Sequence, residues 1–293
     1  MKNYGDYLAQ IFPGIKVQKI SVDAGFTCPN RDGTISSGGC LYCRNDSFSP
    51  GYCDASKSVT SQLESGKKFF SRKYPEMKYL AYFQSYTGTY KKDIKTLFRL
   101  YSEALSVSDI IGLVIATRPD CIEDEVINLL EEINRSFPVF VEFGAETSHN
   151  DTLRIINRNH TWEDLVRSVK KVAEANIHCG IHLIAGLPNE DDDKVMETID
   201  KTIQLPIETI KLHQLQVLKD TPLHQKLQKG EIQIPYYSLE DYLNLCVRIV
   251  KRVPQNIIIE RFLSQSPPEM VISPKWELKN YQFISKLAKL LSI

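Results

Sequence analysis

Apolar runs of strand length alternate with amphipathic segments along most of this chain. The runs are rich in β-branched and aromatic residues, and the segments between them have helical spacing. Regular alternation of this kind implies parallel βαβ units with right-handed crossovers, arranged as a doubly wound sheet or as a partial or full barrel. The predicted strands are 17–22, 78–83, 110–117, 139–146, 177–186 and 208–217, and the predicted helices are 58–74, 93–105, 123–134, 162–176 and 191–203.

Polar and ionisable residues recur at the C-terminal ends of the predicted strands. In a barrel these ends meet at one face, which is where active sites lie. Because five strands agree, we predict a functional site at that face. The residues are Gln84, Ser85, Thr117, Arg118, Glu142, Glu146, His182, His213 and Gln214.

The segment after about Leu218 departs from the pattern. It contains a helix over 238–253, a short strand over 256–260 and a terminal helix over 279–291, with an irregular proline-containing loop between the last two. We therefore expect residues 1–217 to form the core, and residues 218–293 to form an α/β extension packed on it.

The charges of the 293-residue chain balance overall but are unevenly distributed. Lys plus Arg and Asp plus Glu both number 36, which does not predict bulk binding to nucleic acid or membranes. Between Lys57 and Tyr101, however, ten basic residues face three acidic ones, giving a local charge of +7. This stretch is either a set of solvated helix faces whose charges offset one another or a basic face that contacts phosphates.

Targeting features are not evident in the sequence. The first residues do not resemble a signal peptide, and no stretch approaches the length of a transmembrane helix. The seven cysteines, an odd number, favour a reducing cytoplasm over an exported, disulfide-bonded protein. We therefore expect a cytoplasmic location and no membrane partner.

Three cysteines lie in one glycine- and serine-rich loop directly after the first predicted strand. Cys40 and Cys43 form a C-x-x-C pair, and Cys28 precedes them with eleven residues between. Three thiolates can hold a [4Fe–4S] cluster and leave one iron open to a ligand, whereas a fourth from Cys53 would complete a zinc site. Buried or free thiols are a third possibility, and the spacing does not decide among the three.

The surroundings of the cysteines resemble the radical S-adenosylmethionine (SAM) superfamily. Its members carry a three-cysteine motif after the first barrel strand, usually with an aromatic residue, here Tyr42, before the last cysteine. The eleven-residue spacing, in place of the common three, narrows the resemblance to the radical SAM domain of the Elongator catalytic subunit and a related group of stand-alone bacterial proteins. DAGFTCPNRDGTISSGGCLYC is very similar to that bacterial group.

Further matches extend the resemblance from residue 17 to about residue 217. They are TRPDC (117–121), FGAETSHNDTLRIINRNHT (143–161) and GIHLIAGLPNE (180–190). A glutamate commonly precedes the threonine of the first motif in this branch, and here Ala116 takes its place. A ribose contact from that position would therefore be lost, or would fall to Thr117.

The resemblance implies a partial (β/α)6 TIM-like barrel of the radical SAM type, with an iron–sulfur loop at 24–53. Cys28, Cys40 and Cys43 would ligate a [4Fe–4S] cluster, whose open iron would chelate SAM for reductive cleavage to a 5′-deoxyadenosyl radical. Plain core packing is the alternative role for Ile184, and also for His213, which could contact either adenine or substrate. The implied SAM contacts are Tyr42, Gln84, Ser85, Thr87, Thr117, Glu146, Arg158, His182, Ile184 and His213.

Relatives in this branch modify the wobble uridine of tRNA, so the resemblance implies hydrogen abstraction from a uridine side chain. The implied partners are tRNA and an electron donor such as flavodoxin or ferredoxin. The chain has no room for the acetyltransferase domain of the Elongator subunit, so methylation or removal of part of an existing side chain is expected instead. One alternative is a radical SAM enzyme for a small metabolite or peptide. Another is a non-enzymatic RNA-binding module with a four-cysteine zinc site, which leaves the strand-end residues unexplained.

Overall fold

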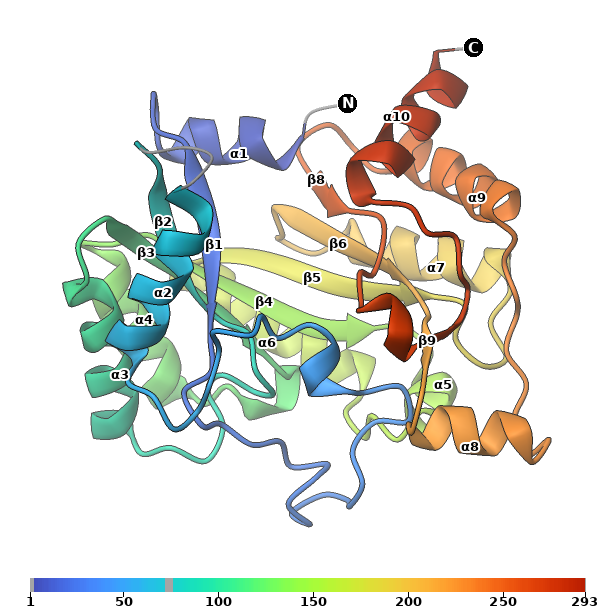
Figure 1. Ribbon diagram of the computed structural model, residues 1–293, viewed down its shortest axis with the longest axis horizontal. Helices are drawn as coiled ribbons and strands as arrows, with labels where there is room; N and C mark the ends of the chain where they lie inside the picture. Colours follow the sequence, from blue (N-terminus) through green and yellow to red (C-terminus); the bar gives the residue numbers. More distant parts are fainter. Residues whose placement is uncertain (1–2, 72–75, 293) are drawn as a thin grey trace.

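A parallel sheet forms the centre of the computed structural model, which describes residues 3–71 and 76–292. Its seven strands run in the order β1-β2-β3-β4-β5-β6-β8 (Figure 1). The order follows the chain without the reversal of a doubly wound sheet, so the predicted partial TIM-like barrel is confirmed. The strands are β1 Val17–Val22, β2 Lys78–Phe83, β3 Ile110–Thr117, β4 Val139–Glu146, β5 His178–Ala185, β6 Thr209–Gln214 and β8 Ile258–Arg261.

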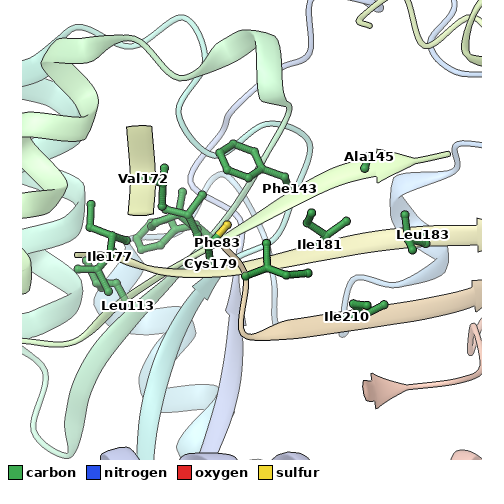
Figure 2. Close-up of a cluster of buried hydrophobic side chains, with 14 of the residues drawn as sticks. Phe83, Leu113, Phe143, Ala145, Val172, Ile177, Cys179, Ile181, Leu183 and Ile210 are labelled. Atoms are coloured by element: carbon green, nitrogen blue, oxygen red, sulfur yellow. The ribbon is translucent and has the colours of Figure 1, made fainter. Parts of the chain in front are cut away.

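Helices cover the outer face of this sheet. Outward-pointing side chains such as Phe143 and Ile181 form one continuous apolar layer with residues such as Val172 of α6 (Figure 2). Burial of both sheet faces explains why the strands appear in the sequence as nearly uninterrupted apolar runs. The covering helices are α2 Val59–Ser71, α3 Ile94–Ser106, α4 Asp124–Asn134, α6 Trp162–Glu174, α7 Asp192–Thr202 and α9 Leu239–Arg252.

A helix that was not predicted, α1 (Tyr4–Ile11), packs against the inner face of the sheet. Leu8 of this helix and the following Phe12 join a second apolar cluster with inward-facing residues such as Phe140 and Ile258. The helix begins in a capping box. The Asn3 side chain accepts from the backbone N–H of Asp6, and the Asp6 side chain accepts from the backbone N–H of Asn3. This apolar plug therefore lies at the end of the barrel where the strands begin (Figure 1).

The plug contributes measurable stability. Leu8→Ala should lower the free energy of unfolding by about 2–4 kcal/mol, because it leaves a cavity in a buried apolar cluster. Gln10→Ala, an exposed position on the same helix, should change it by less than about 0.5 kcal/mol. Urea unfolding followed by circular dichroism measures both, and equal effects would contradict the packing role of α1.

The C-terminal extension completes the sheet as well as packing on it. β8 pairs in parallel with β6, so the sheet has a seventh strand beyond the six that the sequence predicted in the core. The predicted strand 208–217 is divided into two strands. The first, β6, ends at Gln214, whose side-chain oxygen accepts a hydrogen bond from the backbone N–H of Ser264 at 2.6 Å. The chain then turns into β7 (Val217–Leu218), which pairs antiparallel with β9 (Val271–Ser273) inside the predicted irregular loop.

The remaining elements are short or terminal. No helix within the described ranges is both long and apolar enough to cross a bilayer. The terminal helix was predicted, and the other short helices were not. These elements are η1 Asn45–Ser47, η2 Pro119–Cys121, α5 Asn150–Ile155, α8 Pro222–Gln228, η3 Pro268–Met270 and α10 Asn280–Leu291.

Candidate active site

A cavity of about 260 Å³ lies at the C-terminal ends of the strands. Twelve of the thirteen residues singled out from the sequence as cluster ligands or SAM contacts line it. Ser85 does not line it, although its side chain is buried. The twelve are Cys28, Cys40, Tyr42, Cys43, Gln84, Thr87, Thr117, Glu146, Arg158, His182, Ile184 and His213.

The cysteine loop is held in place by the segment that follows α5. The backbone N–H of Leu41 donates to the carbonyl of Ile156 at 3.0 Å, and the Asn157 amide donates to the Gly39 carbonyl at 2.8 Å. Asn30, which the sequence analysis missed, donates to the Arg158 carbonyl at 3.0 Å and approaches the Cys40 sulfur at 3.5 Å. A loop with little regular structure is thereby fixed against the sheet.

The three thiols of the loop share the cavity. Burial, and then the neighbouring Cys40, raise the pKa of the Cys43 thiol to about 11, so metal binding there must displace a proton. Arg158 brings a positive charge to 3.9 Å from the Cys40 sulfur. No three His, Cys, Asp or Glu side chains of the described chain converge on a single-ion site. Three thiols on the cavity wall are one ligand short of a structural zinc site and match a [4Fe–4S] cluster with one open iron, so the donor set suits the cluster better.

Cys53, the fourth thiol of the zinc alternative, is not part of the cavity wall. Its sulfur donates to the backbone carbonyl of Ser21 at 3.1 Å, and burial raises the pKa of its thiol to about 12. Its contacts are those of a protonated structural cysteine packed against β1.

Arg158 and Glu146 form a buried ion pair beside the thiols, at 3.3 Å. Arg158 also donates to the Gly144 carbonyl at 2.6 Å and to the His160 ring at 3.0 Å. Burial and the Arg158 charge lower the pKa of His160 to about 3, so this ring is neutral and accepts the bond. Glu146 has a φ of +66°, a left-handed conformation that is unfavourable for a residue with a long side chain and is found at active sites.

Two buried polar atoms on the cavity wall are left unsatisfied. The hydroxyl of Thr87 and one guanidinium nitrogen of Arg118 have no hydrogen-bond partner in the described part of the chain. Such groups are costly to bury unpaired, and a ligand that carries both an amino and a carboxylate group would satisfy both. The Thr117 hydroxyl, by contrast, already shares a hydrogen bond of 2.7 Å with Thr89.

A set of buried ionisable residues, here called the charged layer, crosses the interior of the barrel. Glu142 lies at its centre and accepts from Tyr82, His182 and Lys211 at 2.7–2.8 Å. Although burial opposes ionisation, Lys19 and Lys211 hold the pKa of the Glu142 carboxyl well below its usual range. Six strands contribute one residue each: Lys19, Tyr82, Glu142, His182, Lys211 and Glu260.

Neither lysine of the charged layer was predicted from the sequence. A lysine within an apolar strand, as in KISV and TIKL, is the signal that could have found them. Buried ion pairs of this kind seldom add net stability relative to apolar packing. Four residues of the charged layer also line the cavity: Tyr82, Glu142, His182 and Lys211. The interior of the barrel is therefore part of the site.

An incomplete parallel barrel with a three-cysteine loop at the C-terminal ends of its strands defines the radical SAM class of enzymes. The chain belongs to the radical SAM superfamily: residues 30–202 match the superfamily model, and residues 207–292 match the radical SAM C-terminal domain. Membership brings with it the cofactors of the superfamily, a [4Fe–4S] cluster and SAM.

The chain is also similar to three proteins of known sequence or structure. Protein YtqA of Bacillus subtilis is 34% identical over 276 residues, which cover 94% of this chain and 85% of YtqA. The structure of Elp3 from Methanocaldococcus infernus matches 95% of this chain with a TM-score of 0.68 at 15% identity. A tRNA uridine(34) acetyltransferase of Methanocaldococcus jannaschii is 27% identical over 133 residues, or 44% of this chain. The chain spans 63% of that Elp3 structure and 24% of the acetyltransferase, less than two thirds of either.

Proposed function

We propose that this radical SAM enzyme acts on the side chain of the wobble uridine in tRNA. When bound, the cluster and SAM supply one-electron cleavage of SAM and thereby hydrogen abstraction from a substrate. Cys28, Cys40 and Cys43 would hold the cluster. The unsatisfied hydroxyl of Thr87 suits the amino group of SAM, and the free nitrogen of Arg118 suits its carboxylate.

The observation that carries the substrate proposal is an exposed aromatic rim at the cavity. The side chains of Tyr86 and Phe48 line the cavity and remain 37% and 39% exposed. The Arg31 guanidinium lies 5.5 Å from the centre of the Tyr86 ring, and the Tyr86 backbone N–H is fixed by Asn45 at 3.2 Å. Aromatic and guanidinium planes presented in this way stack unpaired bases of single-stranded RNA.

The charge of the cavity wall also favours a polyanion. Six basic side chains face two acidic ones; four of the six pair with a carboxylate, and Arg31 and Arg261 form no ion pair within the described residues. Basic grooves attract the RNA backbone. A small metabolite or peptide, the alternative substrate, would not need aromatic side chains exposed at the rim. The basic residues are Arg31, Arg44, Arg118, Arg158, Lys211 and Arg261, and the acidic ones are Glu142 and Glu146.

The basic stretch between Lys57 and Tyr101 contributes less than its net charge suggests. Lys67 and Lys78 both pair with Asp109, and Lys91 pairs with Asp32. Lys57 and Arg99 also have acidic neighbours; Arg72 and Lys73 lie outside the described residues. In much of this stretch the basic side chains are therefore offset by acidic neighbours. The proposed phosphate contacts lie mainly at the mouth of the cavity.

The similarity to the tRNA uridine(34) acetyltransferase supports uridine 34 as the target. It covers 133 residues, so acetyl transfer is not carried over to this chain. We propose one of two reactions instead: methylation of the uridine side chain, or removal of part of an existing side chain.

Substitution of Tyr86 tests the substrate proposal. Tyr86→Ala should weaken binding of undermodified tRNA by about tenfold, because one base loses its stacking partner. Tyr86→Phe keeps the ring and should bind as the wild type does. Affinity is measured on the cluster-loaded protein with SAM and without reductant. Equal affinity of the alanine and phenylalanine variants, or no tRNA binding by the wild type, would contradict the proposal.

A further inference from the structure

Two histidines face the cavity from neighbouring strands. His182 of β5 and His213 of β6 both line it, and their ring centres are 5.6 Å apart. Their roles as hydrogen-bond donors or acceptors depend on which ring nitrogen carries the proton. The partners of each ring determine this.

His182, which lines the cavity, has one unprotonated ring nitrogen. Its Nε2 lies 2.8 Å from a carboxylate oxygen of Glu142, and this carboxylate is ionised by its lysine partners, so Nε2 carries the proton and donates. Burial, and then the Lys211 charge, lower the pKa of His182, which keeps the ring neutral. Its Nδ1 is therefore an acceptor, and it has no partner among the described residues.

His213 reaches the same state through a different partner. Its Nδ1 lies 3.2 Å from the hydroxyl oxygen of Ser264, and that hydroxyl donates its own hydrogen to the Gln214 carbonyl at 2.9 Å. The serine oxygen can therefore only accept, so Nδ1 of His213 carries the proton. Burial and the nearby His182 hold the pKa of His213 well below its usual range. Its Nε2 is left as a second acceptor without a described partner.

Arg261 supplies donors on the same cavity wall. It ends β8, is half-buried and lines the cavity, and its charge is among those that act on His213. Within residues 3–71 and 76–292, its guanidinium makes no hydrogen bond or ion pair. Lys211, by comparison, is bound by Glu142 and Glu260. Arg261 therefore carries N–H groups that a ligand can use.

We propose that His182, His213 and Arg261 form a subsite for the edge of the uracil ring. The Nε2 of His213 accepts the N3–H of the ring with His182 beside it, and the Arg261 guanidinium donates to an adjacent carbonyl. Arg261 has no carboxylate partner within the described residues, so its charge disfavours a cationic ligand and the donor is an uncharged N–H. This assignment rests on the proposed function. The adenine of SAM also presents an N–H group beside an acceptor, so the test must separate the two rings.

Two anticodon stem-loop RNAs that differ only at the wobble position provide the test. Cytosine has nearly the size of uracil, but it replaces the N3–H donor by an acceptor and the O4 acceptor by an amino donor. The cluster-loaded protein, with SAM and without reductant, should bind the uridine RNA about 10- to 100-fold more tightly than the cytidine RNA. His213→Phe and Arg261→Met should each bring this ratio close to one.

A matched control uses an arginine far from the cavity. Arg252→Met removes a guanidinium that pairs with Asp200 on the outer helices, and it should keep the preference for uridine. SAM affinity is measured in the same variants.

The outcomes distinguish the subsite from the proposed function. If both RNAs bind the wild type equally, the subsite is wrong and tRNA binding stands. If His213→Phe weakens SAM binding and leaves the uridine preference intact, the ring is adenine and the assignment is overturned. If SAM binds and neither RNA does, the proposed function fails as well.

Discussion

Cys40→Ala is expected to abolish both the iron–sulfur cluster and the cleavage of SAM. Cys40 is one of three thiols that share the cavity, and Asn30 and Arg158 orient its sulfur. Loss of an outer-shell partner of a metal ligand typically costs 10- to 100-fold in metal affinity or activity. Loss of the ligand itself should therefore lower SAM cleavage by more than about a hundredfold. Iron content, the visible spectrum and 5′-deoxyadenosine formation measure the effect under anaerobic conditions.

Cys53→Ala is the matched control for this prediction. Cys53 is a loop cysteine of similar chemistry, but its thiol is bound to the Ser21 carbonyl and lies outside the cavity wall. We expect this variant to retain its cluster and its SAM cleavage. A protein in which Cys53→Ala is as damaging as Cys40→Ala would contradict the three-cysteine assignment and favour a four-thiolate site.

Glu142→Gln should be the most destabilising single change in the charged layer. It leaves Lys19 and Lys211 buried with Glu260 as their remaining carboxylate. Breaking a buried ion pair from one side typically costs about 3–5 kcal/mol, and we expect a loss of that size in the free energy of unfolding of the apoprotein. Glu197→Gln removes a largely exposed carboxylate near His149 and should change it by less than about 1 kcal/mol.

The same residue gives a pH dependence of stability. The pKa of the Glu142 carboxyl is lower in the folded chain than in the unfolded chain, where it is about 4.3. Its contribution to stability is therefore complete above that pH and is lost as the pH falls below it. In urea unfolding between about pH 6 and pH 3, Glu142→Gln should lose less stability than the wild type. Parallel losses would indicate that Glu142 is not the ionised centre of the layer.

The sequence predicted the βα series well because parallel strands buried on both faces are apolar runs of clear length. It did not predict β8 as part of the core sheet, since four residues give no periodicity and the partner of β8, β6, lies more than forty residues earlier. α1 was missed because its buried face consists mainly of Tyr7 and Leu8. Both β8 and α1 are determined by tertiary contacts and not by a local sequence pattern.

The site was predicted where its residues form continuous motifs. The cysteine loop and the strand-end residues supplied twelve positions that share one cavity. The charged layer was not predicted, because each strand contributes one residue, and only the register of the strands brings Lys19, Glu142 and Lys211 together. The stacking of Arg31 on Tyr86 likewise joins two loops that are unrelated in sequence.

The inner face of the barrel changes in character from one end to the other. The plug on α1 is apolar, the charged layer lies beyond it, and the thiols and the aromatic rim lie at the C-terminal ends of the strands. A base of the proposed RNA substrate that enters at the rim would therefore meet SAM near the thiols and reach polar groups deeper in the barrel. This order of chemistry along one axis fits hydrogen abstraction shielded from bulk water.

The most direct test of the proposed function is the product formed on tRNA. The anaerobically reconstituted protein is incubated with SAM, a reductant and tRNA from cells that lack the enzyme, and the nucleosides are then analysed by mass spectrometry. We predict a mass change confined to the wobble uridine, formed together with 5′-deoxyadenosine and absent in Cys40→Ala. Cleavage of SAM that leaves every tRNA nucleoside unchanged would contradict tRNA as the substrate.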